Sequence, residues 1–383
     1  MPSRQKIAVG LSGGVDSAVA AALLARAGRE VMGLTMLIWP RGGAPRLEAK
    51  TGAKQACFGP GEEEDVAACE SLCAKLGIPY RVVDLSAEYE ERVLGYFRRE
   101  YRSGRTPNPC VVCNRELKFG FLAERARELG YELFATGHYA RIAQREGVAL
   151  LRAAAQEAKD QSYFLYRLGP EILSRVLFPL GELSKDEVRA AARELGLEVA
   201  DKPESQDFVA GGDYAPLFAD APPESGDFVD REGRLLGRHR GLPFYTIGQR
   251  RGLGLSLGPD PLYVLELDAA RNRVVLGPGE GLFAESLVAE DFELRAPWLA
   301  GGPFRARAKI RQNARAAPCA VTLGAAAPSA AATGAAPTGA APLGPGEARI
   351  DFDEPQRAVA PGQSAVLYDD DGLVLGGGII CRR

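Results

Sequence analysis

The sequence predicts an α/β protein with a parallel sheet in its N-terminal half and β-rich domains in its C-terminal half. From residue 5 to about residue 200, apolar runs typical of buried strands alternate with patterns typical of helices. Such alternation implies a parallel sheet with helices on both faces. From about Gly211 glycine and proline become frequent, helical patterns stop, and short alternating runs follow. Short strands between glycine turns are typical of a small β-barrel.

The elements of the N-terminal half follow from apolar periodicity and from glycines that end helices. We expect strands over residues 6–9, 30–38, 80–85 and 132–136. We expect helices over residues 18–27, 62–76, 88–99, 115–129 and 185–195. In a parallel sheet the ligand binds beyond the carboxyl ends of the strands. This brings Ser12, Met36 and Gly137 together at one edge of the sheet.

The C-terminal half divides into two β domains. Residues 262–268 and 273–277 predict a hairpin with Asn272 in its turn. A tract of small uncharged residues between 324 and 346 is interpreted as a flexible insertion in a barrel loop. Barrel strands are expected over residues 305–310, 320–323, 348–352, 364–368 and 373–380. The predicted domains are residues 1–210, 211–285 and 286–383.

Composition excludes several classes of protein. The chain has 383 residues, 46% hydrophobic and 25% charged, which is typical of globular proteins of two or three domains. No apolar run is long enough to span a membrane, and the first predicted strand leaves no room for a signal peptide, so we expect a cytoplasmic protein. Seven cysteines in such a chain favour thiol or metal chemistry over a disulfide framework. With only two histidines, a histidine-rich metal site is nearly excluded.

The charge distribution favours a nucleic-acid partner, although the net charge is −3. Residues 92–118 hold seven basic residues against two acidic ones. Residues 231–251 hold six against one, and residues 295–315 hold six and no acidic residue. Separate basic stretches on an otherwise acidic chain are typical of a surface that follows phosphates. The alternative to a phosphate-binding surface is that any one of these stretches is a solvated loop with scattered charge.

Residues 10–17, Gly-Leu-Ser-Gly-Gly-Val-Asp-Ser, lie between the first predicted strand and the first predicted helix. Backbone N–H groups and the helix dipole make such a junction an anion site. Gly13 and Gly14 let the backbone approach a phosphate, and the hydroxyls of Ser12 and Ser17 can donate to it. The lysine of a P-loop is missing. Asp16 either caps the helix or, as we favour, helps to hold Mg²⁺ on pyrophosphate.

Residues 105–114 read Arg-Thr-Pro-Asn-Pro-Cys-Val-Val-Cys-Asn. Cys113 lies just before the helix predicted from Arg115. A thiol at a helix N-terminus, with Arg115 and Lys118 nearby, is expected to have a lowered pKa. A C-x-x-C pair by itself is compatible with redox, zinc or iron–sulfur chemistry, or with none. Cys69 and Cys73, four residues apart on a predicted helix, and Cys319 and Cys381 in the barrel are interpreted as packing residues.

The glycine loop resembles the PP-loop of ATP pyrophosphatases, which cleave ATP to AMP and pyrophosphate and leave AMP on an acceptor oxygen. Three further motifs follow residues 105–114 along the chain, namely Thr-Gly-His-Tyr-Ala (136–140), Lys-Asp-Gln-Ser-Tyr-Phe-Leu (159–165) and Tyr-Thr-Ile-Gly-Gln-Arg-Arg-Gly-Leu-Gly (245–254). With this set of motifs, in this order, the chain resembles the bacterial tRNA-specific 2-thiouridylases over nearly its whole length.

The resemblance implies a PP-loop domain of the adenine nucleotide alpha hydrolase-like type, then a small central β domain and a C-terminal β-barrel. It implies a tRNA sulfurtransferase that uses ATP and Mg²⁺ to adenylate the C2 oxygen of the wobble uridine in tRNAs for Lys, Glu and Gln, and then replaces that oxygen with sulfur. Such a target base must leave its stack. The implied ATP-binding residues are Gly10, Leu11, Ser12, Gly13, Gly14, Val15, Asp16, Ser17, Met36 and Gly137. The implied contacts with tRNA are His138, Asp160, Gln161, Ser162, Arg311, Gln312 and Gln363.

Cys113 matches the nucleophilic cysteine of the family, but the chain departs from the family at the second cysteine, which usually holds a persulfide. Residues 202–214 contain no cysteine, and Cys110 stands where many members have an aspartate. Two arrangements are open. Either Cys110 is the second thiol, or Cys57, Cys110 and Cys113 bind a 4Fe–4S cluster whose open iron carries the sulfur; we slightly favour the cluster. The sulfur donor is a sulfur-carrier protein, a cysteine desulfurase or sulfide.

Two other classes of function fit less well. An amidotransferase-like synthetase of the same PP-loop group would lack the paired cysteines and the basic barrel. An inactive tRNA- or metal-binding protein need not keep the complete Ser-Gly-Gly-Val-Asp-Ser motif. Release of pyrophosphate only in the presence of tRNA separates these alternatives.

Overall fold

The structure is a computed structural model that describes residues 5–39, 56–59, 61–201, 207–209, 213–255, 260–324 and 343–382. It consists of two compact units, and each is described by itself. The N-terminal unit contains Met1–Tyr96 and Pro109–Ala219, and the C-terminal unit contains Phe97–Asn108 and Asp220–Arg383. The predicted domain bounds at residues 210 and 285 stay a prediction.

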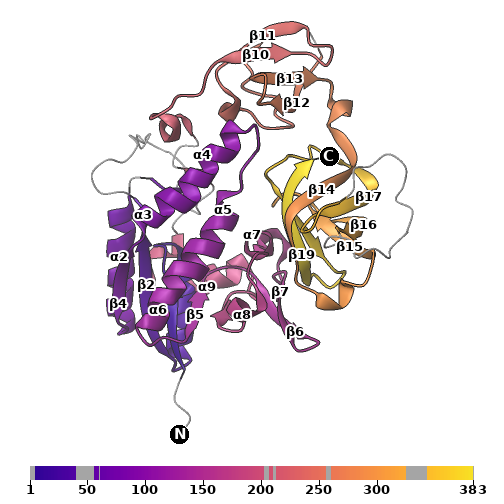
Figure 1. Cartoon of the computed structure of the whole chain (residues 1–383). Helices are drawn as coiled ribbons and strands as arrows, with labels where there is room; N and C mark the ends of the chain where they lie inside the picture. The colour runs from indigo at the N-terminus through magenta and orange to yellow at the C-terminus, as the bar shows by residue number, and fades with distance from the viewer. Residues whose placement is uncertain are drawn as a thin grey trace. The chain divides into compact units, whose positions relative to one another are not determined.

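The N-terminal unit is built on a parallel sheet of five strands in the order β4-β2-β1-β5-β8 (Figure 1). The fully buried Ile7, Ala8 and Val9 lie in its central strand, which pairs with β2 on one side and β5 on the other. The strands are β1 (Lys6–Gly10), β2 (Glu30–Leu37), β4 (Tyr80–Asp84), β5 (Leu133–Thr136) and β8 (Val176–Leu177). The predicted parallel sheet is confirmed. β8 was not predicted, because two residues carry no periodic signal.

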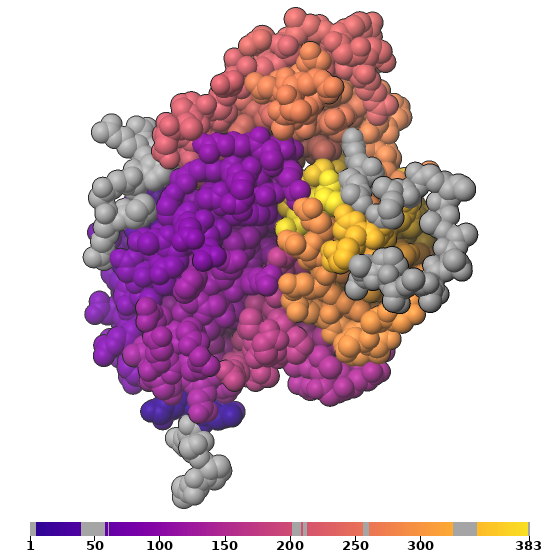
Figure 2. Space-filling model, viewed as in Figure 1, coloured from indigo at the N-terminus to yellow at the C-terminus, as the bar shows by residue number. Residues whose placement is uncertain are grey.

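Helices cover both faces of this sheet, as the alternation predicts. Ala135 packs in a cluster with residues of α1 and α2, whereas its neighbour Phe134 points to the other face and meets the ring of Phe119, 5.8 Å away between centroids. On the face seen in Figure 2, segments coloured purple form most of the surface of this unit. Its other helices are α1 (Val15–Arg26), α2 (Glu62–Leu76), α3 (Ser86–Tyr89), the π-helix η1 (Glu90–Leu94), α7 (Ser162–Leu165), α8 (Pro170–Leu173) and α9 (Lys185–Glu194). Short 3₁₀ turns are η3 (Glu157–Lys159), η4 (Glu198–Asp201) and η6 (Ala215–Phe218).

Residues 109–128 form one continuous helical run, which consists of α5 (Pro109–Val112), the π-helix η2 (Cys113–Leu122) and α6 (Ala123–Glu128). The predicted start of this helix near Arg115 is therefore wrong. Proline fits the first helical position, because its φ is fixed and its missing N–H is not needed there. Cys110 consequently lies in the first turn of the run, and Cys113 lies three residues further, inside the helix.

Two small strand pairs complete the N-terminal unit. β6 (Arg141–Arg145) and β7 (Val148–Arg152) form a hairpin, and β3 (Ala56–Phe58) pairs in parallel with β9 (Asp207–Val209). Neither pair was predicted, because each strand is short and its partner cannot be read from the sequence. Within the described residues, no helix is long and apolar enough to cross a membrane.

The C-terminal unit begins with α4 (Gly95–Arg102), most of which belongs to it. A four-stranded sheet follows in the order β11-β10-β13-β12. The predicted hairpin is confirmed, with Asn272 at a φ of 49° in its turn. The strands are β10 (Gly226–Val229), β11 (Leu235–His239), β12 (Tyr263–Asp268) and β13 (Arg273–Gly277), with the 3₁₀ turns η7 (Leu242–Phe244) and η8 (Gly279–Leu282).

The last part of this unit is a closed six-stranded barrel in the order β14-β17-β16-β15-β18-β19 (Figure 1). The predicted barrel is confirmed, and its interior is filled by small and branched apolar residues such as Ala289, Val321 and Ile350. Most of the 324–346 tract lies outside the described residues. The strands are β14 (Phe283–Leu294), β15 (Phe304–Lys309), β16 (Ala317–Leu323), β17 (Ala348–Arg357), β18 (Ser364–Tyr368) and β19 (Val374–Arg382), with the 3₁₀ turn η9 (Pro297–Leu299).

Candidate functional site

The glycine loop joins β1 to α1 and is held in shape by its own serines. The backbone N–H of Ser12 donates to Ser17 Oγ at 3.2 Å, and Ser17 Oγ donates to the carbonyl of Gly14 at 3.1 Å. Gly13 has a φ of 70°, and a Cβ there would lie 2.6 Å from Asp65 Oδ1, so only glycine fits. The loop therefore has the strand–turn–helix geometry of an anion site.

Neighbouring strands bring two further predicted residues to the loop end of the sheet. Gly137 directly follows β5, and a Cβ there would lie 2.5 Å from Ser17 N and 2.6 Å from the carbonyl carbon of Asp16. Met36 is half-buried near the carboxyl end of β2. Since β2 and β5 both pair with β1, these residues gather at the edge that the parallel order predicts.

Asp16 is not the helix cap, because Gly14 occupies that position. Its carboxylate is instead bound by two residues from elsewhere in the chain. Lys185 Nζ lies 2.8 and 2.9 Å from the two carboxylate oxygens, and Tyr139 donates its hydroxyl to Oδ1 at 2.8 Å. Sequence reasoning missed Lys185, because 169 residues separate it from Asp16. The glycine loop lacks the lysine of a P-loop in sequence, but Lys185, the first residue of α9, lies beside it in the structure.

A second carboxylate, Asp65 of α2, lies against Gly13 of the loop. Its helix is held at the end of β2 by Glu62, which accepts from the backbone N–H groups of Ile38 at 2.7 Å and Trp39 at 3.1 Å. Mg²⁺ in nucleotide sites takes one or two carboxylates together with phosphate oxygens. Asp65 is thus a second carboxylate beside the loop, and the Mg²⁺ role expected for Asp16 stays a prediction.

The two cysteines of the C-x-x-C pair lie on one helical run. Cys110 and Cys113 are half-buried cysteines three residues apart, which places them on the same side of the helix. Asn114 ties this part of the run to α7 by donating from Nδ2 to the carbonyl of Phe164 at 3.2 Å. The side chain of Cys57 lies outside the described residues. Among the described residues, no three histidine, cysteine or acidic side chains come together as metal ligands.

Four of the residues predicted to contact tRNA lie in the N-terminal unit, and their side chains bond within the protein. Asp160 and Ser162 are 4% and 0% exposed, and Ser162 Oγ donates to Asp160 Oδ2 at 2.8 Å. Gln161 Oε1 accepts from the backbone N–H of Tyr139 at 2.9 Å. His138 is bonded to Thr136 through Nδ1 at 2.8 Å, and burial together with the charge of Lys118 lowers the pKa of His138. A direct contact of these residues with tRNA stays a prediction.

The other three lie in the barrel. Arg311 is exposed and Gln312 is half-buried, both in the turn that follows β15. Gln363 lies in the turn before β18, where its amide Nε2 donates to the carbonyls of Thr106 and Pro107, each at 3.1 Å. Their contact with tRNA also stays a prediction.

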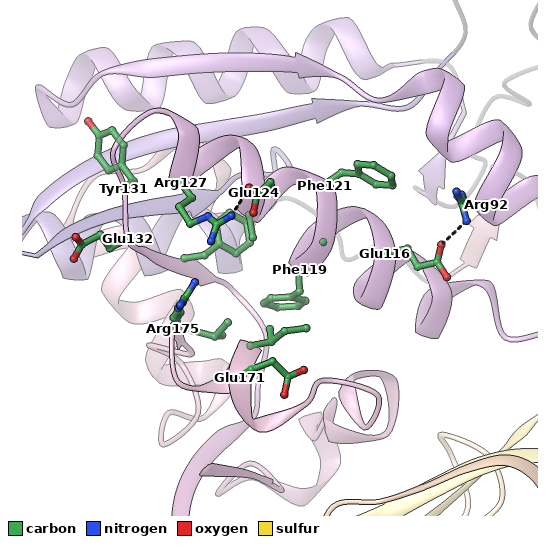
Figure 3. A pocket seen from close by; sticks show the side chains of 15 residues that line it. Arg92, Glu116, Phe119, Phe121, Glu124, Arg127, Tyr131, Glu132, Glu171 and Arg175 are labelled. Carbon is green, nitrogen blue, oxygen red and sulfur yellow. Dashed lines mark hydrogen bonds and ion pairs between the residues drawn. The ribbon is translucent and has the colours of Figure 1, made fainter. Parts of the chain in front are cut away.

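A pocket of about 700 Å³ opens elsewhere in the N-terminal unit, between η2–α6 and the segment of α8 and β8 (Figure 3). The ring of Phe119 extends into it, toward the segment that carries Glu171 and Arg175. None of the predicted site residues lines it. The glycine loop and Gly137 lie at the carboxyl edge of the strands, and a nucleotide site at that edge, rather than in this pocket, stays the prediction.

The parallel sheet, the glycine loop at its central strand and the closed barrel define a nucleotide-binding α/β protein with appended β domains. Protein-family models match the chain in the same order. They are a tRNA methyl transferase HUP domain over residues 5–210, a tRNA methyl transferase PRC-barrel domain over residues 217–278 and an aminomethyltransferase beta-barrel domain over residues 332–380.

Curated relatives match along nearly the whole chain. The tRNA-specific 2-thiouridylase MnmA of Roseiflexus sp. (strain RS-1) is 46% identical, over 98% of this chain and 99% of the relative. The proteins of the same name from Acetivibrio thermocellus and Clostridioides difficile are 42% and 39% identical, each over at least 98% of both chains. The chain belongs to the tRNA-specific 2-thiouridylase family. A solved 4-thiouridine synthetase–RNA complex with bound ATP aligns with a TM-score of only 0.31 at 19% identity over 56% of this chain, too low to carry an argument.

Proposed function

We propose that the protein is an ATP-dependent tRNA sulfurtransferase that forms 2-thiouridine at the wobble position of tRNAs for Lys, Glu and Gln. The observation that carries the proposal is the glycine loop of residues 10–17, formed as an anion site in a chain that matches 2-thiouridylases from end to end. The family models are described as methyl transferases, but the full-length relatives at up to 46% identity support thiolation.

The reaction proceeds by two displacements. The C2 oxygen of the uridine attacks the α-phosphorus of ATP, the bond to the β-phosphate breaks, and pyrophosphate leaves. A sulfur nucleophile then attacks C2, the C2–O bond breaks, and AMP leaves with the oxygen. Adenylation is needed because a carbonyl oxygen is a poor leaving group, whereas AMP is a good one. Holding ATP and base together supplies much of the rate.

The residues around the glycine loop have different roles in this reaction. The backbone of residues 10–15, the hydroxyls of Ser12 and Ser17, and the helix dipole of α1 bind the phosphates. Met36 and Gly137 border the same edge of the sheet. Lys185 balances the charge of Asp16, which would otherwise repel the phosphates at short range. Asp16, together with Asp65 beside Gly13, would hold Mg²⁺, and bound Mg²⁺ would neutralise phosphate charge.

Cys113 is the nucleophile that delivers sulfur: it carries a persulfide formed by transfer of sulfane sulfur from a desulfurase or carrier protein, and the terminal sulfur attacks C2. Cys110, on the same side of the helix, then attacks the Cys113 sulfur. The S–S bond breaks, the terminal sulfur stays on C2, and the resulting Cys110–Cys113 disulfide is reduced by an added thiol. Two thiols are too few to hold a 4Fe–4S cluster, and Cys57 remains the predicted third ligand. The cluster therefore stays a prediction that iron and sulfide analysis of anaerobically reconstituted protein tests. The sulfur donor is a carrier protein, a desulfurase or sulfide, and the place of action is the cytoplasm, where tRNA is modified.

The decisive experiment is mass spectrometry of nucleosides after reaction of the pure protein with tRNA, ATP, a thiol reductant and either a cysteine desulfurase with cysteine or sulfide. We expect 2-thiouridine at the wobble position, with AMP and pyrophosphate released only when tRNA is present. Release of pyrophosphate without tRNA favours a small-molecule synthetase. Binding of ATP or tRNA without any turnover favours an inactive binding protein.

A further inference from the structure

The segment just before the cysteines belongs to the C-terminal unit. Residues Phe97–Asn108 cluster with the β domains, although Pro109 and the helix that follows belong to the N-terminal unit. Gly104, with a φ of 73°, approaches β12 so closely that a Cβ would lie 2.9 Å from the carbonyl oxygen of Leu267. Arg105 is 23% exposed and pairs with Glu290 of β14 at 2.6 Å and with Glu100 at 2.8 Å. The segment is thus fixed on the β domains at two successive residues.

The next two residues are held by residues 361–363, which we call the barrel clamp. Thr106 donates its backbone N–H to the carbonyl of Pro361 at 2.8 Å. Gln363 donates from Nε2 to the carbonyls of Thr106 and Pro107, each at 3.1 Å. Gly362 has a φ of 92°, and a Cβ there would lie 2.7 Å from the oxygen of Thr106. The clamp therefore touches the loop through backbone, side chain and a close approach that only glycine allows.

The clamp is itself anchored to the barrel wall. Gly362 donates its N–H to the carbonyl of Ile380 in β19 at 2.8 Å, and Ile380 donates back to the carbonyl of Gln363 at 2.8 Å. Both hydrogens of the Gln363 amide nitrogen are directed at loop carbonyls. A further ligand of Gln363 would have only its Oε1 atom as a partner.

The backbone between the barrel clamp and the two cysteines has little conformational freedom. Pro107 and Pro109 have fixed φ angles, and Asn108 is restricted because a proline follows it. Asn108 is also buried. Cys110 comes directly after Pro109, and the same rigid helical run carries Cys113. A shift of Thr106 and Pro107 is therefore passed on to both cysteines.

We propose that the barrel clamp positions the C-x-x-C thiols, with Gln363 as the positioning residue. This inference rests on the proposed function, in which Cys113 delivers sulfur to an activated base. It gives residues 361–363 a second task besides any contact with RNA, which is to hold the loop that leads directly into the cysteine helix. Gln363 then affects the sulfur-transfer step and not the affinity for tRNA.

The test compares Gln363→Glu and Gln363→Ala with Gln356→Ala. Glutamate has the shape of glutamine but places an acceptor against two carbonyl oxygens. Gln356 is a matched control, because it lies in β17 of the same barrel and its Nε2 donates only to the carbonyl of Glu354, at 2.8 Å. For each protein we would measure kcat and KM for tRNA in 2-thiouridine formation, tRNA-dependent pyrophosphate release, and the pH profile of iodoacetamide alkylation at Cys110 and Cys113.

We expect kcat to fall about tenfold or more in both Gln363 variants, because a small displacement of a reacting group costs much of the rate once both hydrogen bonds to the loop are lost. KM for tRNA and pyrophosphate release stay near the wild-type values, while the alkylation profile of the two thiols changes. Gln356→Ala behaves as wild type. Gly362→Ala, which keeps Gln363 but pushes on Thr106, gives the same pattern and serves as an independent test if the Gln363 variants do not fold.

A higher KM for tRNA at unchanged kcat, with an unchanged alkylation profile, would overturn the proposal and make Gln363 an RNA contact. If the wild-type protein forms no 2-thiouridine, the proposed function fails. The alkylation profiles of the variants then still decide whether the clamp positions the thiols.

Discussion

Lys185 Nζ contacts both carboxylate oxygens of Asp16, at 2.8 and 2.9 Å, across 169 residues of sequence. The pair is partly shielded from water, with the lysine side chain 9% exposed and the aspartate 31% exposed. The position of Lys185 is set by the start of α9, where Ser184 and Glu187 form a capping box. Asp16 lies in the first turn of α1. The capped start of α9 thus places the Lys185 ammonium group against the first turn of α1, beside the glycine loop.

Lys185→Ala is expected to lower the free energy of unfolding by about 2 kcal/mol, less than for a fully buried pair because Asp16 is partly exposed. It is also expected to raise the Kd for ATP about tenfold, since an unbalanced carboxylate then faces the phosphates. Urea unfolding and calorimetric titration measure the two effects. Arg193→Ala removes a cation from the last turn of the same helix and should leave the Kd for ATP unchanged.

The double variant Asp16→Asn/Lys185→Ala separates two roles of the lysine. If Lys185 acts by balancing Asp16, the double variant recovers most of the ATP affinity lost in Lys185→Ala. If Lys185 contacts phosphate, the affinity stays low. An ATP Kd that is unchanged in Lys185→Ala itself would contradict both roles.

Gly137→Ala and Gly14→Ala should differ sharply, although both residues belong to the predicted ATP site. A Cβ at Gly137 would meet backbone atoms of α1 at 2.5 and 2.6 Å, which forces the helix start to move. Gly14 has a φ of −97° and room for a Cβ, whose nearest neighbour is Ser12 Oγ at 3.6 Å. We expect Gly137→Ala to lower the free energy of unfolding by about 1–3 kcal/mol. We also expect the variant to lose tRNA-dependent release of pyrophosphate.

Gly14→Ala should fold with near wild-type stability, so any loss of ATP binding in it reports a close approach of the phosphates to this Cα. Thermal unfolding measures the stability of both variants, and the tRNA-dependent pyrophosphate assay measures their activity. Equal stability of the two variants would mean that the approach of Gly137 to α1 has been misjudged.

The thiols should react with iodoacetamide in an order set by their burial. Cys69, Cys73 and Cys319 are buried, and desolvation raises the pKa of Cys73 and of Cys319 to about 12. Cys110 and Cys113 are only half-buried. We expect peptide mapping at mildly alkaline pH to find Cys110 and Cys113 alkylated well before the three buried thiols, because the thiolate is the reacting form. Labelling of Cys73 or Cys319 at the same rate would refute this order.

Cys113→Ser should abolish 2-thiouridine while ATP binding stays intact, because the substitution leaves the loop edge of the sheet untouched. Cys319→Ser is the control. It changes a buried barrel thiol that has no part in the proposed chemistry, and we expect it to reduce stability rather than the rate per folded molecule. A Cys113→Ser protein that still thiolates tRNA would exclude Cys113 as the nucleophile.

The sequence predicts best those elements whose signals are local. α2 runs from Glu62 to Leu76 as expected, because acidic residues favour its first turn and Gly77, at a φ of 64°, ends it. The predicted start of the cysteine helix, near Arg115, lies six residues too late, because the helix begins at Pro109. A proline in the sequence is compatible both with a loop and with the first position of a helix, and the sequence alone does not distinguish the two. The partners of Asp16 and Gln363 depend on tertiary folding over more than a hundred residues, and no periodicity encodes such contacts.

Unfolding at mildly acidic pH should be governed by the only two histidines, His138 and His239. Burial is the main cause that lowers the pKa of each, with smaller contributions from Lys118 and Arg238. In His239, Nδ1 accepts from the N–H of Gly241 at 3.0 Å, so Nε2 carries the hydrogen that is donated to the carbonyl of Asn272 at 3.1 Å. Protonation of Nδ1 would break the first of these bonds.

The sign follows from proton uptake. Below the ordinary histidine pKa of about 6.5, the unfolded chain binds protons that the folded protein does not, so the free energy of unfolding falls as pH drops through this range. Asp230, Asp268, Asp353 and Glu187 have lowered pKa values, and the stability that they contribute is lost only at more acidic pH. The histidines therefore dominate the window between roughly pH 5 and 6.5.

Urea unfolding at pH 7.5, 6.5 and 5.5 should show this decline, and a variant at each histidine should flatten it. His138 lies in the N-terminal unit and His239 in the C-terminal unit, so His138→Asn and His239→Gln should flatten different transitions if the units unfold separately. Lys185→Ala, which removes no histidine, should keep the wild-type slope over this range although its stability is lower. A slope that is unchanged in both histidine variants would assign the acid sensitivity to the carboxylates.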